Sequence, residues 1–158
     1  MVRLEEVTII RAPIGRCFDL SRSIELHMRS TVRTGEVAVA GVTSGLIGLG
    51  AEVTWRARHF GVTQTMTVRI TAFDSPHHFQ DRMVRGAFRF FKHDHWFVER
   101  DGMTEMRDVL RFAAPFWILG VLVEPLLRGY LRRFLRERNS VIREMAEGDG
   151  WRDFLAGR

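Results

Sequence analysis

Two histidines one residue apart, His93 and His95, lie within the aromatic segment FFKHDHWF. Alternate residues of a β-strand point to the same side of a sheet, so in a strand both imidazoles would face one way. Imidazoles that share a face can bind a metal, transfer protons, or hydrogen-bond to the polar group of a ligand. The choice among these chemistries depends on the other polar side chains that the fold brings to the same face.

The segment that follows predicts a β-hairpin that gives His95 a carboxylate partner. The pair Asp101-Gly102 is a preferred two-residue hairpin turn,. Pairing outward from this turn places His95 opposite Asp108 and His93 opposite Leu110. We therefore expect both histidines on the apolar side of the hairpin. The other residues expected on that side are Phe91, Phe97, Met106 and Phe112.

A second hairpin is predicted where residues 52–59 and 62–72 alternate between apolar and polar side chains. This alternation is typical of an antiparallel sheet with one face in water. A two-residue turn between the segments places Trp55 opposite Met66 on the inner face. His59 and Gln64 are expected on the same inner face.

A further strand over residues 79–85 carries Asp81 and Met83 on its apolar face. A turn back into the strand over residues 90–100 would bring Asp81 near His93. A carboxylate among apolar side chains must be paired or hydrogen-bonded, because burying it alone is costly. The sequence therefore predicts a buried network of histidines and aspartates.

Helices are predicted on both sides of these strands. Residues 2–10 resemble a strand, and Pro13 is suited to begin a short helix over about residues 13–20, followed by another near 23–28,. Residues 117–147 have a helical period, interrupted by Pro125. We expect the apolar stripe of this long helix to be formed by Leu122, Leu126, Tyr130, Phe134, Val141 and Met145. We expect its arginines to lie in water: Arg128, Arg132, Arg133, Arg136 and Arg138.

Length and composition indicate one domain, with residues 1–147 as its body and the glycine-containing tail 148–158 expected to be mobile. The formal net charge is +5, from 23 arginines, one lysine and 19 acidic residues. The arginines are spread along the chain, which favours a solvated basic surface over a nucleic-acid-binding site. So high a ratio of arginine to lysine is typical of GC-rich bacterial genomes.

We expect the protein to be cytoplasmic, because its cysteine content and its apolar segments do not match those of exported or membrane proteins. The single cysteine, Cys17, excludes an intrachain disulfide framework,. The start, MVRLEEVTII, carries acids where a signal peptide has a basic segment. The apolar segment FWILGVLVEPLL falls short of the ~20 residues of a membrane-spanning helix, so no stable insertion into a membrane is expected.

Three stretches carry a resemblance to a known family: TIIRAPIGRCFDL, GLGAEVTWRARHFG, and FQDRMVRGAFRFFKHDHWF followed by TEMRDVLRF. Together with the order of elements, they resemble the START-like, SRPBCC superfamily, which includes birch-pollen-allergen-like proteins and polyketide cyclases. The resemblance implies an α+β helix-grip fold. In this fold a curved antiparallel sheet of about six to seven strands wraps around a long C-terminal helix, with two short helices after the first strand.

The resemblance also implies a cavity between sheet and helix that binds a hydrophobic or amphipathic small molecule or lipid, with transport as one use of such binding. Only some members of the superfamily are enzymes, and its small single-domain members usually bind no metal. We therefore expect neither a metal nor another cofactor. The residues expected to bind the ligand are Trp55, His59, Gln64, Met66, Asp81, Met83, Phe91, His93, His95, Phe97, Met106, Asp108, Leu110 and Phe112.

Three other interpretations remain open at this point. An enzyme, either a polyketide cyclase/dehydrase-like lyase or an isomerase, would use His95 as a general base oriented by Asp108. A His-x-His metal site would need His59 or a carboxylate as a third ligand. A membrane- or partner-docking module would use the arginine-rich helix. The oligomeric state is also open, a homodimer included.

Overall fold

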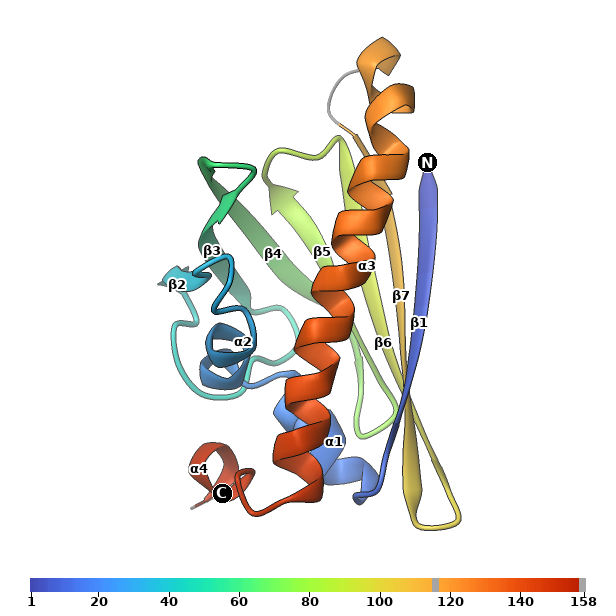
Figure 1. Cartoon of the computed structure of the whole chain (residues 1–158). Helices are drawn as coiled ribbons and strands as arrows, with labels where there is room; N and C mark the ends of the chain where they lie inside the picture. The colour runs from blue at the N-terminus through green and yellow to red at the C-terminus, as the bar shows by residue number, and fades with distance from the viewer. Residues whose placement is uncertain (115–116, 157–158) are drawn as a thin grey trace.

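Seven antiparallel strands form one curved sheet, and a long helix crosses its concave face (Figure 1). The computed structural model describes residues 1–114 and 117–156, with side chains for residues 1–114 and 123–156. The strand order is β1-β7-β6-β5-β4-β3-β2. The elements are β1 (Val2–Ile10), α1 (Ile14–Ser21), α2 (Ile24–Ser30), β2 (Val37–Gly41), β3 (Glu52–His59), β4 (Val62–Asp74), β5 (His78–Arg85), β6 (Phe90–Arg100), β7 (Met103–Ala113), α3 (Trp117–Glu147) and α4 (Arg152–Leu155).

The hairpin between β6 and β7 has the predicted register. Asp101 and Gly102 form its turn with φ angles of 52° and 74°, the left-handed values that this tight turn requires,. His95 lies opposite Asp108 and His93 opposite Leu110, as expected. The two histidines therefore face the concave side of the sheet.

The other predicted pairings are confirmed as well. The β3–β4 hairpin turns at residues 60–61 and places Trp55 opposite Met66. Strand β5 pairs with β6 so that Asp81 lies opposite His93. Three neighbouring strands thus bring two carboxylates and two imidazoles to one region of the concave face.

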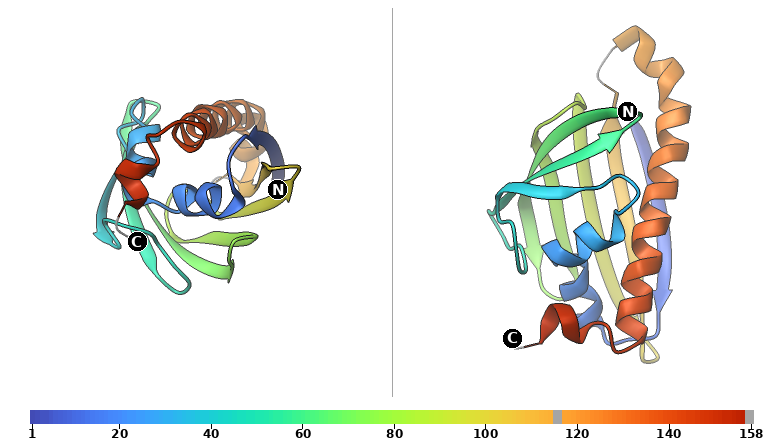
Figure 2. Two further views of the ribbon diagram at one scale, coloured as in Figure 1. Left: turned by 90° about the horizontal axis from the view of Figure 1, so that it is seen from below. Right: turned by 60° about the vertical axis from the view of Figure 1, so that its left-hand side comes forward.

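Helix α3 runs along the concave face of the sheet, and the sheet curves around this helix (Figure 2). The predicted stripe along this helix is only partly correct. Met145 is buried as expected, but Leu126 is 63% exposed and Tyr130 and Phe134 are half-buried. The side chain of Leu122 lies outside the described side chains. The face that is buried against the sheet and α1 is formed by Leu135, Arg138, Asn139, Ile142 and Ala146.

The expectation that Arg138 lies in water is wrong, because its exposed fraction is 4%. Its guanidinium donates to the backbone oxygen of Ser21 at 3.0 Å. By contrast, Arg132 and Arg136 are partly exposed and form ion pairs with Glu6 of β1 at 2.8 and 3.0 Å. In the described part of the chain, no helix is long and apolar enough to cross a membrane.

The hydrophobic core is divided into two clusters. The larger one is centred on Phe18 of α1, whose ring packs edge-on against Phe73, Phe79 and Phe97 at 5.4–5.5 Å. The smaller one includes Phe112 and lies toward the other end of the sheet. Helix α1 packs against β6 and β7 and closes one end of the apolar face.

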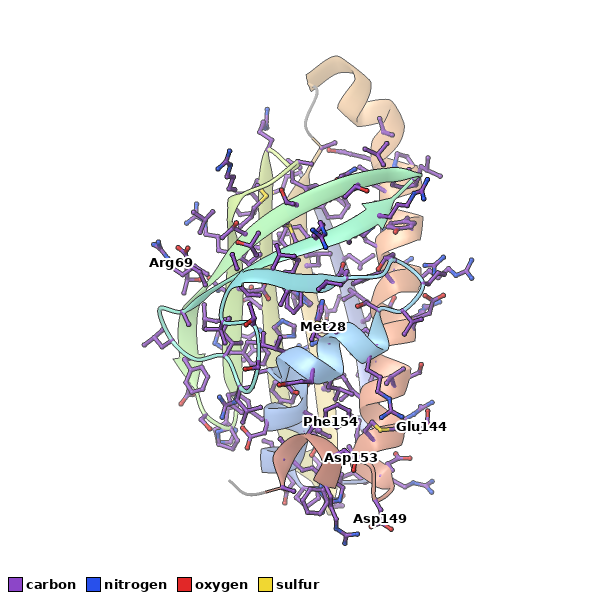
Figure 3. The ribbon with its side chains drawn as sticks, turned by 90° about the vertical axis from the view of Figure 1, so that its left-hand side faces the viewer. Met28, Arg69, Glu144, Asp149, Asp153 and Phe154 are labelled. Atoms are coloured by element: carbon purple, nitrogen blue, oxygen red, sulfur yellow. The ribbon has the colours of Figure 1, made fainter. Side chains whose placement is uncertain are left out.

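The tail beyond residue 147 forms helix α4, which packs against α2. Trp151, Phe154 and Leu155 contact the larger core cluster together with Met28 of α2. In Figure 3, Phe154 lies beneath the helix that carries Met28, while Arg69 projects from the outer face of the sheet. The domain boundary at residue 147 and the mobility of the tail in solution stay predictions.

Candidate ligand-binding site

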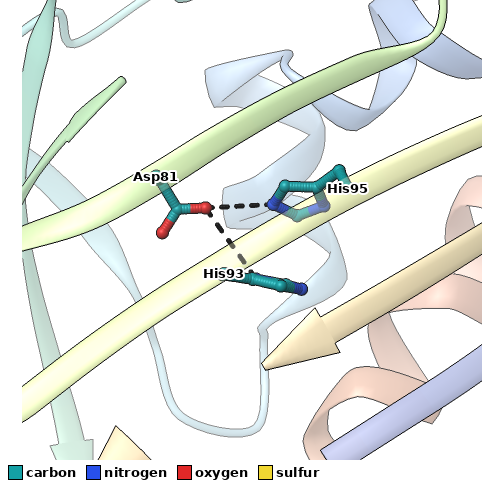
Figure 4. Close-up of side chains that lie close together, drawn as sticks. All are labelled: Asp81, His93 and His95. Atoms are coloured by element: carbon teal, nitrogen blue, oxygen red, sulfur yellow. Dashed lines mark hydrogen bonds and ion pairs between the residues drawn. The ribbon is translucent and has the colours of Figure 1, made fainter. Parts of the chain in front are cut away.

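Asp81, His93, His95 and Asp108 form a ring of polar side chains on the concave face. The shortest hydrogen bonds run diagonally between strands: His95 Nε2 to Asp81 Oδ2 at 3.0 Å, and His93 Nε2 to Asp108 Oδ1 at 2.9 Å. His93 Nδ1 is 3.8 Å from Asp81 Oδ2, so that this carboxylate faces both imidazoles (Figure 4). His95 Nδ1 is 2.9 Å from Asp108 Oδ1, but at an angle too oblique for a hydrogen bond.

The ring is buried, and burial competes with pairing to set the pKa of each member. Burial opposes ionisation of Asp108, but the hydrogen bond from His93 and the close imidazole of His95 lower its pKa well below the usual value,. The pKa of Asp81 is lowered because the two histidines outweigh the same cost of burial. Burial and the neighbouring His95 lower the pKa of His93. Burial also opposes charge on His95, but the two carboxylates raise its pKa.

These shifts favour one proton arrangement. A proton is favoured on His95, which lies between the two carboxylates, over His93, whose Nε2 is 2.9 Å from Asp108 Oδ1. Buried polar groups are costly when unpaired, and each of these four side chains makes at least one hydrogen bond within the network,. The ring can therefore both orient a polar ligand group and exchange hydrogen bonds with it.

Two residues of α3 complete the network from the other side of the cavity. Asn139 Nδ2 donates to Asp108 Oδ2 at 2.7 Å and also approaches Thr8 Oγ1 at 3.3 Å. Arg138 Nη1 lies 3.8 Å from Asp108 Oδ1 and donates to Asn139 Oδ1 at 3.2 Å. Sequence reasoning missed both residues. Asn139 could have been noticed in the sequence, because asparagine is a poor helix former and its place in the middle of a long helix suggests a specific contact.

The ring lines the inner of two neighbouring chambers between the sheet and α3. The inner chamber has a volume of about 110 Å³ and is lined by Asp81, His93 and His95 together with apolar walls such as Trp55 and Leu110. The outer chamber has a volume of about 330 Å³ and a mostly apolar lining. The two chambers share a boundary formed by Glu36, Met66, Phe91, Leu131 and Phe134.

A second cluster of polar side chains, Glu36, His59 and Tyr130, lies at this boundary. Of these, the sequence analysis predicted only His59 as a site residue. His59 Nδ1 is hydrogen-bonded to the Tyr130 hydroxyl at 2.7 Å, and His59 Nε2 is 3.7 Å from Glu36 Oε1. Glu36 also pairs with His27, whose ring stacks on Trp55 at 4.1 Å. Burial lowers the pKa of His59, an effect that the charge of Glu36 opposes.

The predicted site residues fall into three groups. The inner chamber is lined by Trp55, Met66, Asp81, Phe91, His93, His95 and Leu110. The outer chamber is lined by His59, Gln64, Met66 and Phe91. Five predicted residues line neither chamber: Met83, Phe97, Met106, Asp108 and Phe112.

The residues of the last group pack outside both chambers, and their contact with a ligand stays a prediction. Phe97 and Met106 pack in the core beside α1, and Phe112 packs in the smaller cluster, against which Met83 also lies. Asp108 has no exposed surface because the two histidines and Asn139 cover it. The sequence placed these residues on the correct face, but it could not show which ends of that face the helices fill.

The long helix across the concave face of an antiparallel sheet, with two short helices between β1 and β2, is the helix-grip fold of START-like proteins. Comparison with solved structures confirms this fold. No profile of a known protein family matches the sequence, and no curated protein matches it.

Three solved structures illustrate the similarity. The Zhui aromatase/cyclase from Streptomyces sp. R1128 aligns over 99% of this chain and 98% of its own, with a TM-score of 0.75 and 13% identity. A START superfamily protein from Mycobacterium smegmatis aligns over 92% and 97%, with a TM-score of 0.69 and 9% identity. Major latex-like protein 151 from Panax ginseng aligns over 93% and 98%, with a TM-score of 0.63 and 14% identity.

Proposed function

We propose that this protein binds an amphipathic small molecule between the sheet and α3. The apolar part of the molecule occupies the outer chamber, and its polar end reaches the Asp81, His93 and His95 side chains. The observation that carries this proposal is the shared boundary between an apolar chamber and a smaller chamber with buried polar groups at its end. Small-molecule sites are typically apolar pockets with a few placed polar groups.

The size of the cavity supports a ligand of modest length. Ligand pockets usually have volumes of about 300–1,000 Å³, and the outer chamber alone has about 330 Å³. The inner chamber, at about 110 Å³, accommodates a small polar group and its ordered water. A medium-sized ring system or short acyl chain with one polar end matches this division better than a large uniform lipid.

The enzymatic alternative is supported by the fold of an aromatase/cyclase and by a histidine that lines the inner chamber. A general base needs a free lone pair within reach of the substrate. Both nitrogens of His95 lie within 3.0 Å of a carboxylate oxygen, and the pKa of this ring is raised. His95 is therefore poorly suited to abstract a proton from a substrate.

The docking alternative has less support from the geometry of α3. Arg132 and Arg136 are paired with Glu6, Arg133 is paired with Glu137, and Arg138 is buried. Pairing within the chain reduces the positive charge available to an anionic surface. We therefore prefer a ligand in the cavity to a membrane against the helix.

The experiment that tests the proposal begins with native mass spectrometry of freshly purified protein, to detect a co-purified small molecule. Binding of the amphipathic fluorophore anilinonaphthalene sulfonate then gives a titratable signal. Leu131→Trp should weaken its binding at least about tenfold, because Leu131 lines both chambers and the larger ring fills them,.

Ser140→Trp is the matched control, since Ser140 is exposed on the same helix and lines neither chamber. It should bind the fluorophore like the wild type. Equal binding by both variants would place the fluorophore outside the cavity and overturn the proposal. So would a wild-type protein that carries no small molecule and binds no fluorophore.

A further inference from the structure

One candidate ligand atom from each of Asp81, His93 and His95 converges at the inner end of the cavity. Among the described residues, these three form the set of histidine, cysteine and acidic side chains whose ligand atoms all lie within 4.8 Å of one another. Asp81 Oδ2 is 3.0 Å from His95 Nε2 and 3.8 Å from His93 Nδ1. Ligand atoms around a tetrahedral ion with bonds of about 2.0–2.2 Å are about 3.3–3.6 Å apart.

Asp108 orients both imidazoles from the opposite side. Its Oδ1 atom lies 2.9 Å from His93 Nε2 and 2.9 Å from His95 Nδ1. Each ring therefore turns one nitrogen toward Asp108 and the other toward Asp81. This is the arrangement of metal-binding histidines, whose second nitrogen usually faces a carboxylate that fixes the orientation of the ring.

The three side chains are held on rigid and buried elements. They belong to two paired strands, and the exposed fractions of His93 and His95 are 7% and 3%. Asp108 is itself fixed by Asn139 from α3. A site that is built before the ion arrives loses little conformational entropy on binding.

The charges also favour a cation. When both imidazoles are neutral, the two carboxylates of Asp81 and Asp108 face only one positive charge, the guanidinium of Arg138, so one negative charge is left over. The inner chamber touches Asp81, His93 and His95 together, so a fourth position would open into the cavity. An ion there would replace the hydrogen bond between His95 and Asp81 with two bonds to the metal.

From this convergence we infer that Asp81, His93 and His95 form a binding site for a divalent transition-metal ion, with Zn²⁺ as the best match. Two imidazole nitrogens and one carboxylate oxygen are ligands that suit Zn²⁺ and exclude Ca²⁺ and Mg²⁺, which prefer oxygen atoms alone. The sequence analysis did not favour a metal, because small single-domain members of the superfamily that the chain resembles usually bind none. The pairing of β5 with β6 supplies Asp81 as the third ligand. The open position would face the polar end of a bound molecule.

The test uses the full chain, treated with a chelator, dialysed and titrated with Zn²⁺ by calorimetry. The wild type should bind one ion, and Asp81→Asn and His93→Asn should each weaken binding at least about tenfold. His78→Asn is the matched control, since His78 pairs with Asp94 on the outer face of the same strands. It should bind Zn²⁺ like the wild type.

Absence of saturable Zn²⁺ binding by the wild type would overturn the inference, and this result does not depend on how any variant folds. Equal binding by the wild type and Asp81→Asn would also overturn it. Replacing Zn²⁺ with Co²⁺ provides a second readout, because tetrahedral Co²⁺ absorbs visible light strongly and octahedral Co²⁺ weakly. The wild type should show the strong absorption and His93→Asn should lose it.

The metal site and the proposed ligand-binding function are separable. Chelator-treated protein should still bind anilinonaphthalene sulfonate if the cavity accepts amphipathic molecules. Fluorophore binding without any Zn²⁺ binding would overturn the metal site and leave the ligand proposal standing. Zn²⁺ binding by a protein that carries no small molecule and binds no fluorophore would support the metal site and overturn the ligand proposal.

Discussion

At the scale of single residues, the most informative side chain is the buried carboxylate of Asp108. Asp108 has no exposed surface, yet its oxygens accept hydrogen bonds from both His93 and Asn139. Each of these bonds offsets part of the cost of burying a carboxylate. The orientation of the two histidines therefore depends on residues that never reach the cavity.

Asn139→Ala should destabilise the protein by about 1–3 kcal/mol, because it leaves an oxygen of Asp108 buried without its amide donor,. Urea unfolding followed by circular dichroism measures the change. Ser140→Ala, at the next position and exposed, should change the free energy of unfolding by no more than about 0.5 kcal/mol,. Similar losses for both variants would show that the amide of Asn139 contributes nothing special.

His59 should contribute to stability in a pH-dependent way. Burial lowers its pKa in the folded state, against the opposing charge of Glu36, so the unfolded state binds the proton more readily,. Its contribution is present above the unfolded value of about 6.5 and is lost as the pH falls below it. Comparison of wild type and His59→Gln by urea unfolding at about pH 7.5 and about pH 5.5 isolates this residue.

The difference in unfolding free energy between wild type and His59→Gln should move against the wild type at the lower pH. A difference that stays constant across this range would contradict the lowered pKa of His59. An NMR titration of the His59 ring in the folded protein offers a direct check, since its midpoint should fall below the ordinary value.

At the scale of elements, strands and turns were predictable because their signals are local. The alternation of apolar and polar residues, together with the Asp101-Gly102 turn, was sufficient to place His95 opposite Asp108. The buried face of α3 was not predictable in this way, since two of its members are Arg138 and Asn139. Their partners come from α1, β1 and β7, and no local pattern records such contacts between distant segments.

The short helix α4 gives a prediction at this scale. Phe154→Ala should destabilise the protein by about 1–2 kcal/mol, less than a fully buried phenylalanine, because its ring packs only partly against the core,. Thermal and urea unfolding measure the loss. Val32→Ala, at a site that is 76% exposed, should be nearly neutral. A neutral Phe154→Ala would instead support a tail that is mobile in solution.

At the scale of the whole molecule, the fold could be predicted more completely than the site. The order of strands and helices was sufficient to identify the helix-grip architecture, and the solved structures share it at 9–14% identity. The division of the cavity into two chambers was not evident, because it depends on Glu36, Met66 and Phe134 meeting from three separate segments. Fold follows from patterns repeated along the chain, whereas the shape of a cavity follows from a few distant contacts.

The strand order carries a consequence for how the chain acquires this shape. Strand β1 pairs with β7, so Val2 lies opposite Phe112, and the chain must be synthesised as far as β7 before β1 finds its neighbour. Pairings between such distant segments are slow to form, because a long loop must close before they stabilise anything. During translation β1 therefore waits without its neighbouring strand, and assembly of the sheet can finish only after β7 has left the ribosome,.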